Sequence, residues 1–398
     1  MAGLLGSPLW RALLLLVLPA LMASAEPLPR YYNAIFSFGD SFSDTGNFVI
    51  INSGKLPNMP KFPPPRPGSP PSPSTTTFFR RPTGRPSDGR LIIDFIAEAV
   101  GLPLVPPFLS NFSRGANFAI VGGTALDVGY FLRHNASGVP PFRSSLRAQI
   151  GWFRKLKRSL ICNDTTGCRE RLSGSLFVVG ELGSNDYWYI LAGGRGVHEA
   201  KPLVPEVVGA ICRGVERLVE EGARHVVVSG TPPAGCMPMA LARYADAAAS
   251  MSRAELAREY DLRTGCLRRL NGLAQYHNWM LREAVVRMRA KYPDANLVYA
   301  DFYKPVAQII RRPAKFGFNE PLRACCGGGG LYNYDPEAAC GSPGATVCDD
   351  PSVYVHWDGI HLTEAAYKFI VDGWLDGVYA YPSILSLTQH RQISAHLV

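Results

Sequence analysis

Two distant segments carry side chains that can act together on an ester. Ser41 lies in FSFGDSFSDTGN, where a short apolar run ends among glycine and acidic residues. Near the C-terminus, HWDGIHLTEAAY places Asp358 three residues before His361. One turn can therefore hold the carboxylate against one ring nitrogen, while the other nitrogen faces a serine. A hydroxyl, a base and an orienting carboxylate are the parts of nucleophilic acyl transfer.

The same chemistry needs donors for the developing oxyanion. GELGSNDYW places Asn185 after a Gly-rich turn, from which its amide can project; helix capping is the alternative role. NFAIVGGTA supplies Gly122 and Gly123, where the backbone can approach a ligand closely; a sharp turn is the alternative. Ser41 can also be a turn residue or a cap. No one of these segments decides the chemistry alone.

The other polar residues near these segments are interpreted as structural. Asp40 and Asp44, with Asn47 beside them, are expected to support the turn that carries the serine. No pair of cysteines has the spacing of a zinc site, and we expect neither a metal nor a cofactor. Surface or structural roles are expected for the remaining histidines, which are His134, His198, His225, His277, His356, His390 and His396.

Alternating elements must position these residues. Apolar runs at 34–40, 116–122, 175–183, 224–230 and 295–303 are typical of buried strands in a parallel sheet. Amphipathic stretches lie at 89–100, 144–160, 205–221, about 252–290 and 362–374. The alternation predicts an α/β fold, a three-layer α/β/α sandwich with a five-stranded parallel sheet. The carboxyl ends of the strands would then place Ser41, Gly122 and the segment after Gly183 at one rim.

The N-terminus predicts entry into the secretory pathway. Residues 1–25 combine Arg11, an apolar stretch from Ala12 to Met22 and small residues before the expected cleavage site, as in a signal peptide. A retained membrane anchor is the alternative, but the stretch is short and contains a proline. Sequons at Asn111, Asn135 and Asn163 predict N-glycosylation.

The cysteines indicate an oxidising compartment, because eight of the nine lie in loop-like segments. Sequence alone cannot choose among their pairings. Cys162 and Cys168 can close a short loop, and Cys325 and Cys326 are expected to bond separately to partners such as Cys340 and Cys348. Cys212 shares a helical face with apolar residues and is expected to be a buried free thiol.

Length and charge limit the domain organisation and the binding partners that the chain can have. The 398 residues carry a formal charge of +9, which falls to +8 without the signal peptide. The basic residues are dispersed rather than clustered with aromatics, which argues against nucleic-acid binding and favours retention on anionic polysaccharide. Residues 26–398 are expected to form one domain, with a proline-rich surface insertion at about 55–78.

The chain resembles plant-type GDSL esterases/lipases of the SGNH hydrolase superfamily from about residue 33 to 380. The resemblance rests on four ordered blocks: FSFGDSFSDTGN, GANFAIVGGTA, GSNDY and DGIHLTEAAY. Further similarity lies in FFRRPTGRPSDGRLIIDFIAEAVGLP and in ACCGGGGLYNYDPEAACGSPGATVC. It implies the flavodoxin-like SGNH hydrolase fold.

The resemblance also implies roles for individual residues. Ser41 would be the nucleophile, and Asp358 and His361 would complete the triad. Gly122 and Asn185 would join the backbone N–H of Ser41 as oxyanion donors, with Gly123 replacing Gly122 if the turn lies one residue later. Phe42 stands where the family name implies leucine, and the insertion between Lys55 and Ser74 is longer than the family pattern.

Together these features imply a secreted serine carboxylic-ester hydrolase that forms and then hydrolyses an acyl-enzyme. The basic charge and the secretory route favour acetyl groups on cell-wall polysaccharide such as xylan. Lipid acyl esters, phenolic choline esters and acyl transfer to a sugar or alcohol are alternatives. The intact serine, asparagine and histidine argue against a non-catalytic carbohydrate-binding relative. Oligomeric state, and residence in the Golgi or outside the cell, stay open.

Overall fold

The computed structural model describes residues 31–52, 78–110, 114–134, 138, 140, 143–158, 165–192 and 194–386. The predicted signal peptide, the three sequon asparagines and the proline-rich insertion up to residue 77 lie outside these ranges. No helix within the described ranges is long and apolar enough to cross a bilayer.

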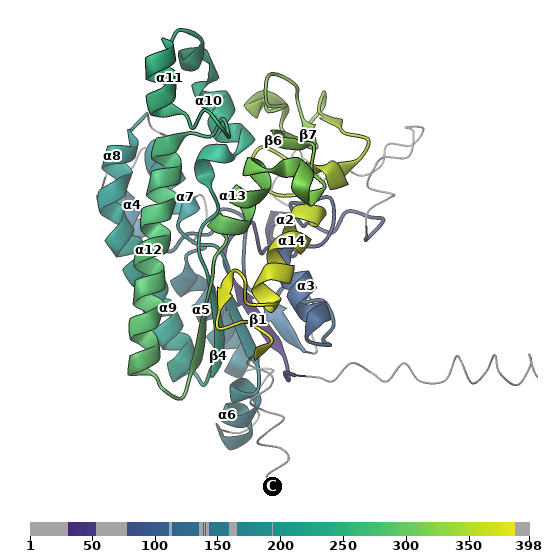
Figure 1. Cartoon of the computed structure of the whole chain (residues 1–398). Coiled ribbons are helices and arrows are strands. Elements are labelled where there is room, and N and C mark those ends of the chain that lie inside the picture. Colours follow the sequence, from purple (N-terminus) through teal and green to yellow (C-terminus); the bar gives the residue numbers. More distant parts are fainter. Residues whose placement is uncertain are drawn as a thin grey trace, which may run out of the picture.

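A six-stranded sheet with the order β10-β5-β4-β3-β1-β2 forms the middle of the molecule (Figure 1). All four residues of β1 are buried, as expected for a strand covered on both faces. Four of the five predicted runs contain the parallel strands β1 (Ile35–Phe38), β3 (Leu176–Val179), β4 (His225–Ser229) and β5 (Asn296–Ala300), whereas the run at 116–122 overlaps the remaining parallel strand, β2 (Gly115–Asn117), only at residues 116 and 117. The sequence did not predict β10 (Ala380–Tyr381), an antiparallel edge strand of two residues.

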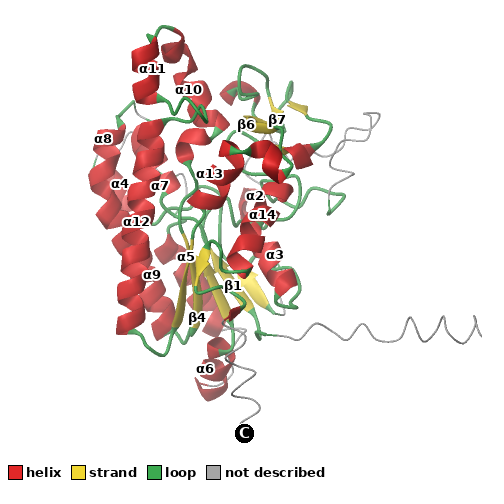
Figure 2. Ribbon diagram, in the orientation of Figure 1, coloured by secondary structure: helices red, strands yellow, loops and turns green. Residues whose placement is uncertain are grey.

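Helices cover both faces of this sheet, which confirms the three-layer sandwich (Figure 2). One face carries α5 (Leu146–Leu156), α9 (Val204–Glu220) and α12 (Arg268–Lys291), and the other carries α3 (Ile92–Ala99) and α14 (Glu364–Leu375). The amphipathic stretch at about 252–290 forms two helices. A turn containing Gly265, with a φ of +74°, separates α12 from α11 (Arg253–Glu259).

Other helices and short strands connect these layers and extend the structure beyond the sheet. The helices among them are α2 (Asn47–Asn52), α4 (Val128–Arg133), α6 (Thr165–Ser173), α7 (Ser184–Leu191), α8 (Val197–Ala200), α10 (Pro238–Ala249) and α13 (Tyr303–Arg311). The short strands are β6 (Glu320–Ala324), β7 (Cys326–Gly327), β8 (Thr346–Val347) and β9 (Tyr354–His356).

The strand order explains why the predicted site segments meet. β1 lies between β2 and β3, so the chain crosses to one side after β1 and to the other side after β2. Such a reversal leaves a crevice beyond the carboxyl ends of the central strands, where α/β proteins bind ligands. The segments that follow β1, β2 and β3 all leave the sheet at this edge.

The segment between α13 and α14 forms a disulfide-linked excursion above the same edge. Cys325 bonds to Cys348 and Cys326 to Cys340, as the sequence suggested. The backbone N–H of Cys325 donates to the carbonyl of His356, and that of Cys326 donates to the carbonyl of Trp357. The cross-linked cysteines therefore hold the backbone just before the predicted Asp358 and His361.

Other cysteines follow the expected division between bonded and free. Cys236 bonds to Cys266, and Cys168 is also disulfide-bonded, whereas Cys162 lies outside the described residues. Cys212 is free, as expected, but it is only partly buried. Burial, with the nearby negative charge of Glu216, raises the pKa of its thiol to about 11, which keeps it protonated and unreactive at neutral pH.

We expect peptide mapping of the non-reduced protein to recover the pairs 236–266, 325–348 and 326–340, with Cys212 alkylated. Replacing Cys326 and Cys340 together with serine should lower the free energy of unfolding by about 3 kcal/mol, because it opens a loop of 14 residues. Cys212→Ser is the matched control and should leave the unfolding midpoint nearly unchanged. Equal losses in both variants would contradict a stabilising role for the cross-link.

Candidate active site

Ser41 lies in a tight turn directly after β1, and its side chain is buried. Gly39 has a φ of +143°, and a Cβ there would come within 3.3 Å of the Gly180 Cα. The side-chain amide of Gln149, on α5, binds the backbone on both sides of the Gly39 Cα. Its Oε1 accepts from the Gly39 N–H at 2.9 Å, and its Nε2 donates to the Gly39 carbonyl at 2.7 Å. The turn therefore has little freedom to move.

Asp44 connects this turn to the segment after β2. Its buried carboxylate accepts the N–H groups of Gly46, Asn47 and Phe48, and also that of Val121 at 3.0 Å. Burial nevertheless raises the pKa of Asp44 to about 6. The interpretation of Asp44 and Asn47 as supports of the turn agrees with these contacts, since the Asn47 amide also donates to two carbonyls of the β2 segment.

Asp40 connects the turn to the segment after β3, through a contact that sequence reasoning missed. Asp40 and Glu181 are both 1% exposed, and their carboxyl groups hydrogen-bond to one another. Burial and the charge of Glu181 raise the pKa of Asp40 well above its usual range, and burial also raises the pKa of Glu181. Two buried carboxyls in contact cannot both ionise cheaply, which favours one proton held between them.

The predicted oxyanion donors lie around this pair. The Asn185 Nδ2 donates to Asp40 Oδ2 at 3.1 Å and to the carbonyl of Gly123 at 3.0 Å. The N–H of Gly123 is itself used, donating to the Ile120 carbonyl at 2.9 Å. Neither Ser41 nor Gly122 donates its backbone N–H to any acceptor in the described part of the chain. Of the two candidate glycines, Gly122, with a φ of +75°, is therefore the one whose backbone N–H has no acceptor among the described residues.

Asp358 and His361 form the expected pair within one turn before α14. Asp358 Oδ2 lies 2.8 Å from His361 Nδ1, and its Oδ1 accepts the backbone N–H groups of Ile360 and His361 at 2.7 Å. Burial acts to raise the pKa of Asp358, but the charge of His361 and these hydrogen bonds outweigh it and lower the pKa. The carboxylate is therefore ionised and holds the imidazole by Nδ1. Nε2 is buried and has no hydrogen-bond partner among the described residues.

Packing brings this pair to the serine turn. The ring of Phe42, the residue after Ser41, meets the His361 ring edge-on with centroids 5.5 Å apart. On the other side, Tyr334 covers Gly359 so closely that a Cβ there would lie 2.2 Å from the tyrosine ring. The Gly359 carbonyl also accepts from the Met239 N–H at 2.9 Å. The four sequence blocks thus converge on residues 40–44, although each comes from a different part of the chain.

Sequence reasoning missed three supporting residues. Glu181 and Gln149 are described above, and Asp186 accepts the N–H groups of Ala125 and Leu126 at 2.9 Å, which fixes the segment after Gly123. Burial raises the pKa of Asp186 to about 7. A signal existed for Glu181 and Asp186, because acids in an apolar GELGSNDY segment at a strand end need buried partners.

A buried Asp-His pair packed against a serine-bearing turn is the arrangement expected of an ester hydrolase, and the comparisons place the chain in that class. Residues 35–374 match the family described as GDSL-like lipase/acylhydrolase. The chain belongs to this family and is a carboxylic-ester hydrolase. Within the described residues, no group of three or more His, Cys, Asp and Glu side chains is arranged to hold a metal ion.

Two relatives illustrate the extent of the likeness. A GDSL esterase/lipase of Arabidopsis thaliana is 42% identical over 385 residues, covering 93% of this chain and 98% of the relative. The sinapine esterase of Brassica napus is 40% identical over 371 residues, covering 91% and 90%. Phospholipase A1 from Streptomyces albidoflavus NA297 aligns with 86% of this chain and 99% of its own, but at 12% identity and a TM-score of 0.34 it supports no inference.

The Asp40–Glu181 contact predicts how stability depends on pH. A carboxyl whose pKa is raised by folding contributes stability below its unfolded pKa of about 4, and that stability is lost as pH rises toward the folded pKa. Glu181→Gln removes one of the two acids and keeps a donor to Asp40. The fall in thermal midpoint from pH 5 to pH 8 should therefore be smaller in Glu181→Gln than in the wild type.

Glu181→Ala is the matched control for this variant, because it removes the acid and the contact together. Its midpoint should be lower than that of Glu181→Gln at both pH values. The other buried acids, Asp44 and Asp186, are unchanged in both variants and contribute equally. An unaltered pH dependence in Glu181→Gln would show that the pair does not share a proton.

Proposed function

We propose that the protein is a secreted serine esterase that forms an acyl-enzyme on Ser41 and removes acetyl groups from a cell-wall polysaccharide such as xylan. The observation that carries the catalytic assignment is the Asp358–His361 pair. The buried Nε2 of His361 has no hydrogen-bond partner among the described residues, and its ring lies against the residue after Ser41. Secretion is inferred from the N-terminal 25 residues and agrees with the disulfides.

In the proposed mechanism, His361 Nε2 takes the proton of the Ser41 hydroxyl as its oxygen attacks the ester carbonyl carbon. Asp358 holds the imidazole by Nδ1 and stabilises the positive charge that forms. The tetrahedral intermediate collapses, and His361 donates that proton to the departing alcohol oxygen. Water then repeats the sequence on the acyl-enzyme, releasing the acid and restoring Ser41.

The oxyanion is assigned to three donors, the N–H groups of Ser41 and Gly122 and the Asn185 amide. The two backbone donors have no competing acceptor among the described residues. Both hydrogens of the Asn185 amide have acceptors, Asp40 and the Gly123 carbonyl. In the proposed mechanism, the amide exchanges the Gly123 carbonyl for the oxyanion, since such contacts often form fully only with substrate present. The contact with Asp40 would keep the side chain oriented during the exchange.

Acetylated polysaccharide is the proposed substrate because the charge after removal of the signal peptide is +8 and wall polysaccharides are commonly anionic. A second candidate is a phenolic choline ester, which is favoured by the 40% identity to a sinapine esterase. The two substrates differ in the leaving group, a sugar hydroxyl in one case and choline in the other. Lipid esters and acyl transfer to an alcohol use the same acyl-enzyme and stay alternatives.

One panel separates these candidates. Purified enzyme is given acetylated xylan, de-acetylated xylan as a blank, sinapoylcholine, and p-nitrophenyl esters of increasing chain length. Release of acetate from xylan at a higher kcat/KM than hydrolysis of the choline ester supports the proposal, and the reverse order assigns the second candidate. Adding a sugar or alcohol acceptor and analysing the products distinguishes transfer from hydrolysis.

Ser41→Ala should abolish turnover of p-nitrophenyl acetate, and Asp358→Asn should lower kcat/KM by about 10⁴-fold because the imidazole loses its orienting carboxylate. In the wild type, kcat/KM should rise with pH, because a general base acts in its unprotonated form. A rate that is flat between pH 5 and 8, or an undiminished Asp358→Asn, would refute the triad.

Asn185→Ala tests the oxyanion assignment separately from the base. Loss of one donor should lower kcat by roughly 10²- to 10³-fold, with the position of the pH rise unchanged. Steady-state kinetics of this variant and of Asp358→Asn across the same pH range make the comparison. A change confined to KM would mean that Asn185 binds substrate and does not stabilise the transition state.

A further inference from the structure

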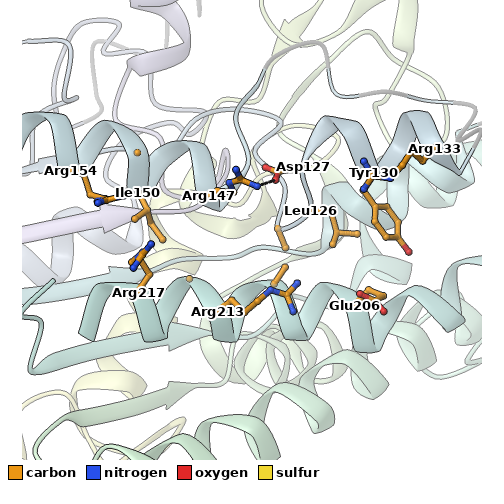
Figure 3. A pocket seen from close by; sticks show the side chains of 14 residues that line it. Leu126, Asp127, Tyr130, Arg133, Arg147, Ile150, Arg154, Glu206, Arg213 and Arg217 are labelled. Atoms are coloured by element: carbon orange, nitrogen blue, oxygen red, sulfur yellow. Dashed lines mark hydrogen bonds and ion pairs between the residues drawn. The ribbon is translucent and has the colours of Figure 1, made fainter. Parts of the chain in front are cut away.

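A groove lined by residues of α4, α5 and α9 has no role in the proposed chemistry. It encloses about 640 Å³ between α4, α5 and α9 (Figure 3). Its floor begins at Ala125 and Leu126, whose N–H groups bind the carboxylate of Asp186, the residue after Asn185. The groove therefore begins on a segment that also carries a proposed oxyanion donor.

The walls of this groove are strongly basic. Five arginines line it against only two acidic residues, Asp127 and Glu206. Arg133 and Arg213 form no ion pair with any acidic side chain in the described part of the chain. The pairs of Arg147 with Asp127 at 3.3 Å and of Arg217 with Glu220 are largely exposed and weak, whereas Arg154 pairs with the less exposed Glu221. The groove thus offers uncompensated positive charge to a ligand.

The arginines are spread along the groove instead of converging on one point. Arg213 and Arg217 are four residues apart on α9, about 6 Å along its axis. Across the groove, Arg147 and Arg154 are seven residues apart on α5, about 10 Å along its axis. In Figure 3 the two helices present these side chains along facing walls. A small anion can contact one or two of these groups, whereas a chain with repeated negative charges can contact several.

We propose that this groove binds a uronate-bearing segment of an acidic polysaccharide. Carboxylates at intervals along such a chain match guanidinium groups at intervals along the groove. Nucleic acid fits less well, because Tyr130 is the sole aromatic among the described residues that line the groove, and single strands bind largely by stacking on aromatic rings. Because the groove begins at Ala125 and Leu126, three and four residues after Gly122, a polymer held here would raise the local concentration of acetyl esters near the Gly122 segment. This inference rests on the proposed polysaccharide esterase function.

One position lets a larger side chain fill the groove without changing the charge of the protein. Gly151 lines it from the middle of α5, and a Cβ there would meet no atom within 4 Å. Gly151→Trp should therefore enter open space, and replacing a mid-helix glycine does not weaken the helix. It provides a steric test that is independent of the arginines.

The test measures binding in the Ser41→Ala background, so that its outcome does not depend on turnover. The probes are sodium polygalacturonate, the same polymer fully methyl-esterified, and free galacturonate. The double variant Arg133→Gln plus Arg213→Gln should bind polygalacturonate at least tenfold more weakly, and Gly151→Trp should also bind it more weakly. Arg311→Gln plus Arg312→Gln on α13 and just after it makes the same change in net charge elsewhere and should bind as the parent does. Unfolding midpoints confirm that each variant is folded.

Several outcomes would overturn the inference. These are no binding of polygalacturonate by the parent, equal binding of the methyl-esterified polymer, binding of the monomer as tight as that of the polymer, or equal loss in the two double variants. Tighter binding of duplex DNA of equal charge would assign the groove to nucleic acid instead. Wild-type release of acetate from xylan, measured separately, tests the proposed function. If the enzyme deacetylates xylan but the groove does not bind polygalacturonate, only the groove inference is refuted. If the groove binds polygalacturonate but xylan is not deacetylated, only the proposed function is refuted.

Discussion

The contact between Asp40 and Glu181 is the constraint on which the site geometry depends. Both carboxyls are buried, and they connect the turn after β1 to the turn after β3 at the point where the strand order reverses. A buried pair of this kind is stable only if it holds a proton and its remaining oxygens are satisfied. Phe42, Ser184 and Asn185 supply those donors, so the residues that flank the nucleophile and the oxyanion amide are fixed by the same network.

The base reaches this network from outside the sheet. Asp358 and His361 follow an excursion with only short strands of its own, and two disulfides with the carbonyls of His356 and Trp357 hold its backbone. At the other end of the segment, Glu364 begins α14 and accepts three N–H groups of Arg90, from its backbone and its side chain. The imidazole is therefore positioned by cross-links and an ion pair, whereas the serine is positioned by buried hydrogen bonds at the end of the sheet.

The sequence predicted the sheet and the site segments because both depend on local patterns. Apolar runs indicated where the parallel strands lie. The three-residue spacing of Asp358 and His361 allowed the two side chains to meet within one turn, as they do in the structure. The edge strand β10 was missed because two residues carry no periodicity. The choice between Gly122 and Gly123, and the contact of Glu181 with Asp40, depend on where distant backbone atoms fall. No pattern within one segment encodes those distances.

The residues proposed for catalysis and the arginine-lined groove lie in different parts of the fold. This separation explains how one fold can serve many esters. The groups that would perform the chemistry are buried or lie on tight turns, and a change in Asp358 or Asn185 disturbs more than one hydrogen bond. The groove arginines instead project from α4, α5 and α9 into the groove, while Phe153 on α5 and Ile211 on α9 pack into the core. An outward-facing residue can change without altering that core packing. Selection for a different polymer can therefore act on the helix surfaces and leave the proton-sharing pair and the Asp-His turn untouched.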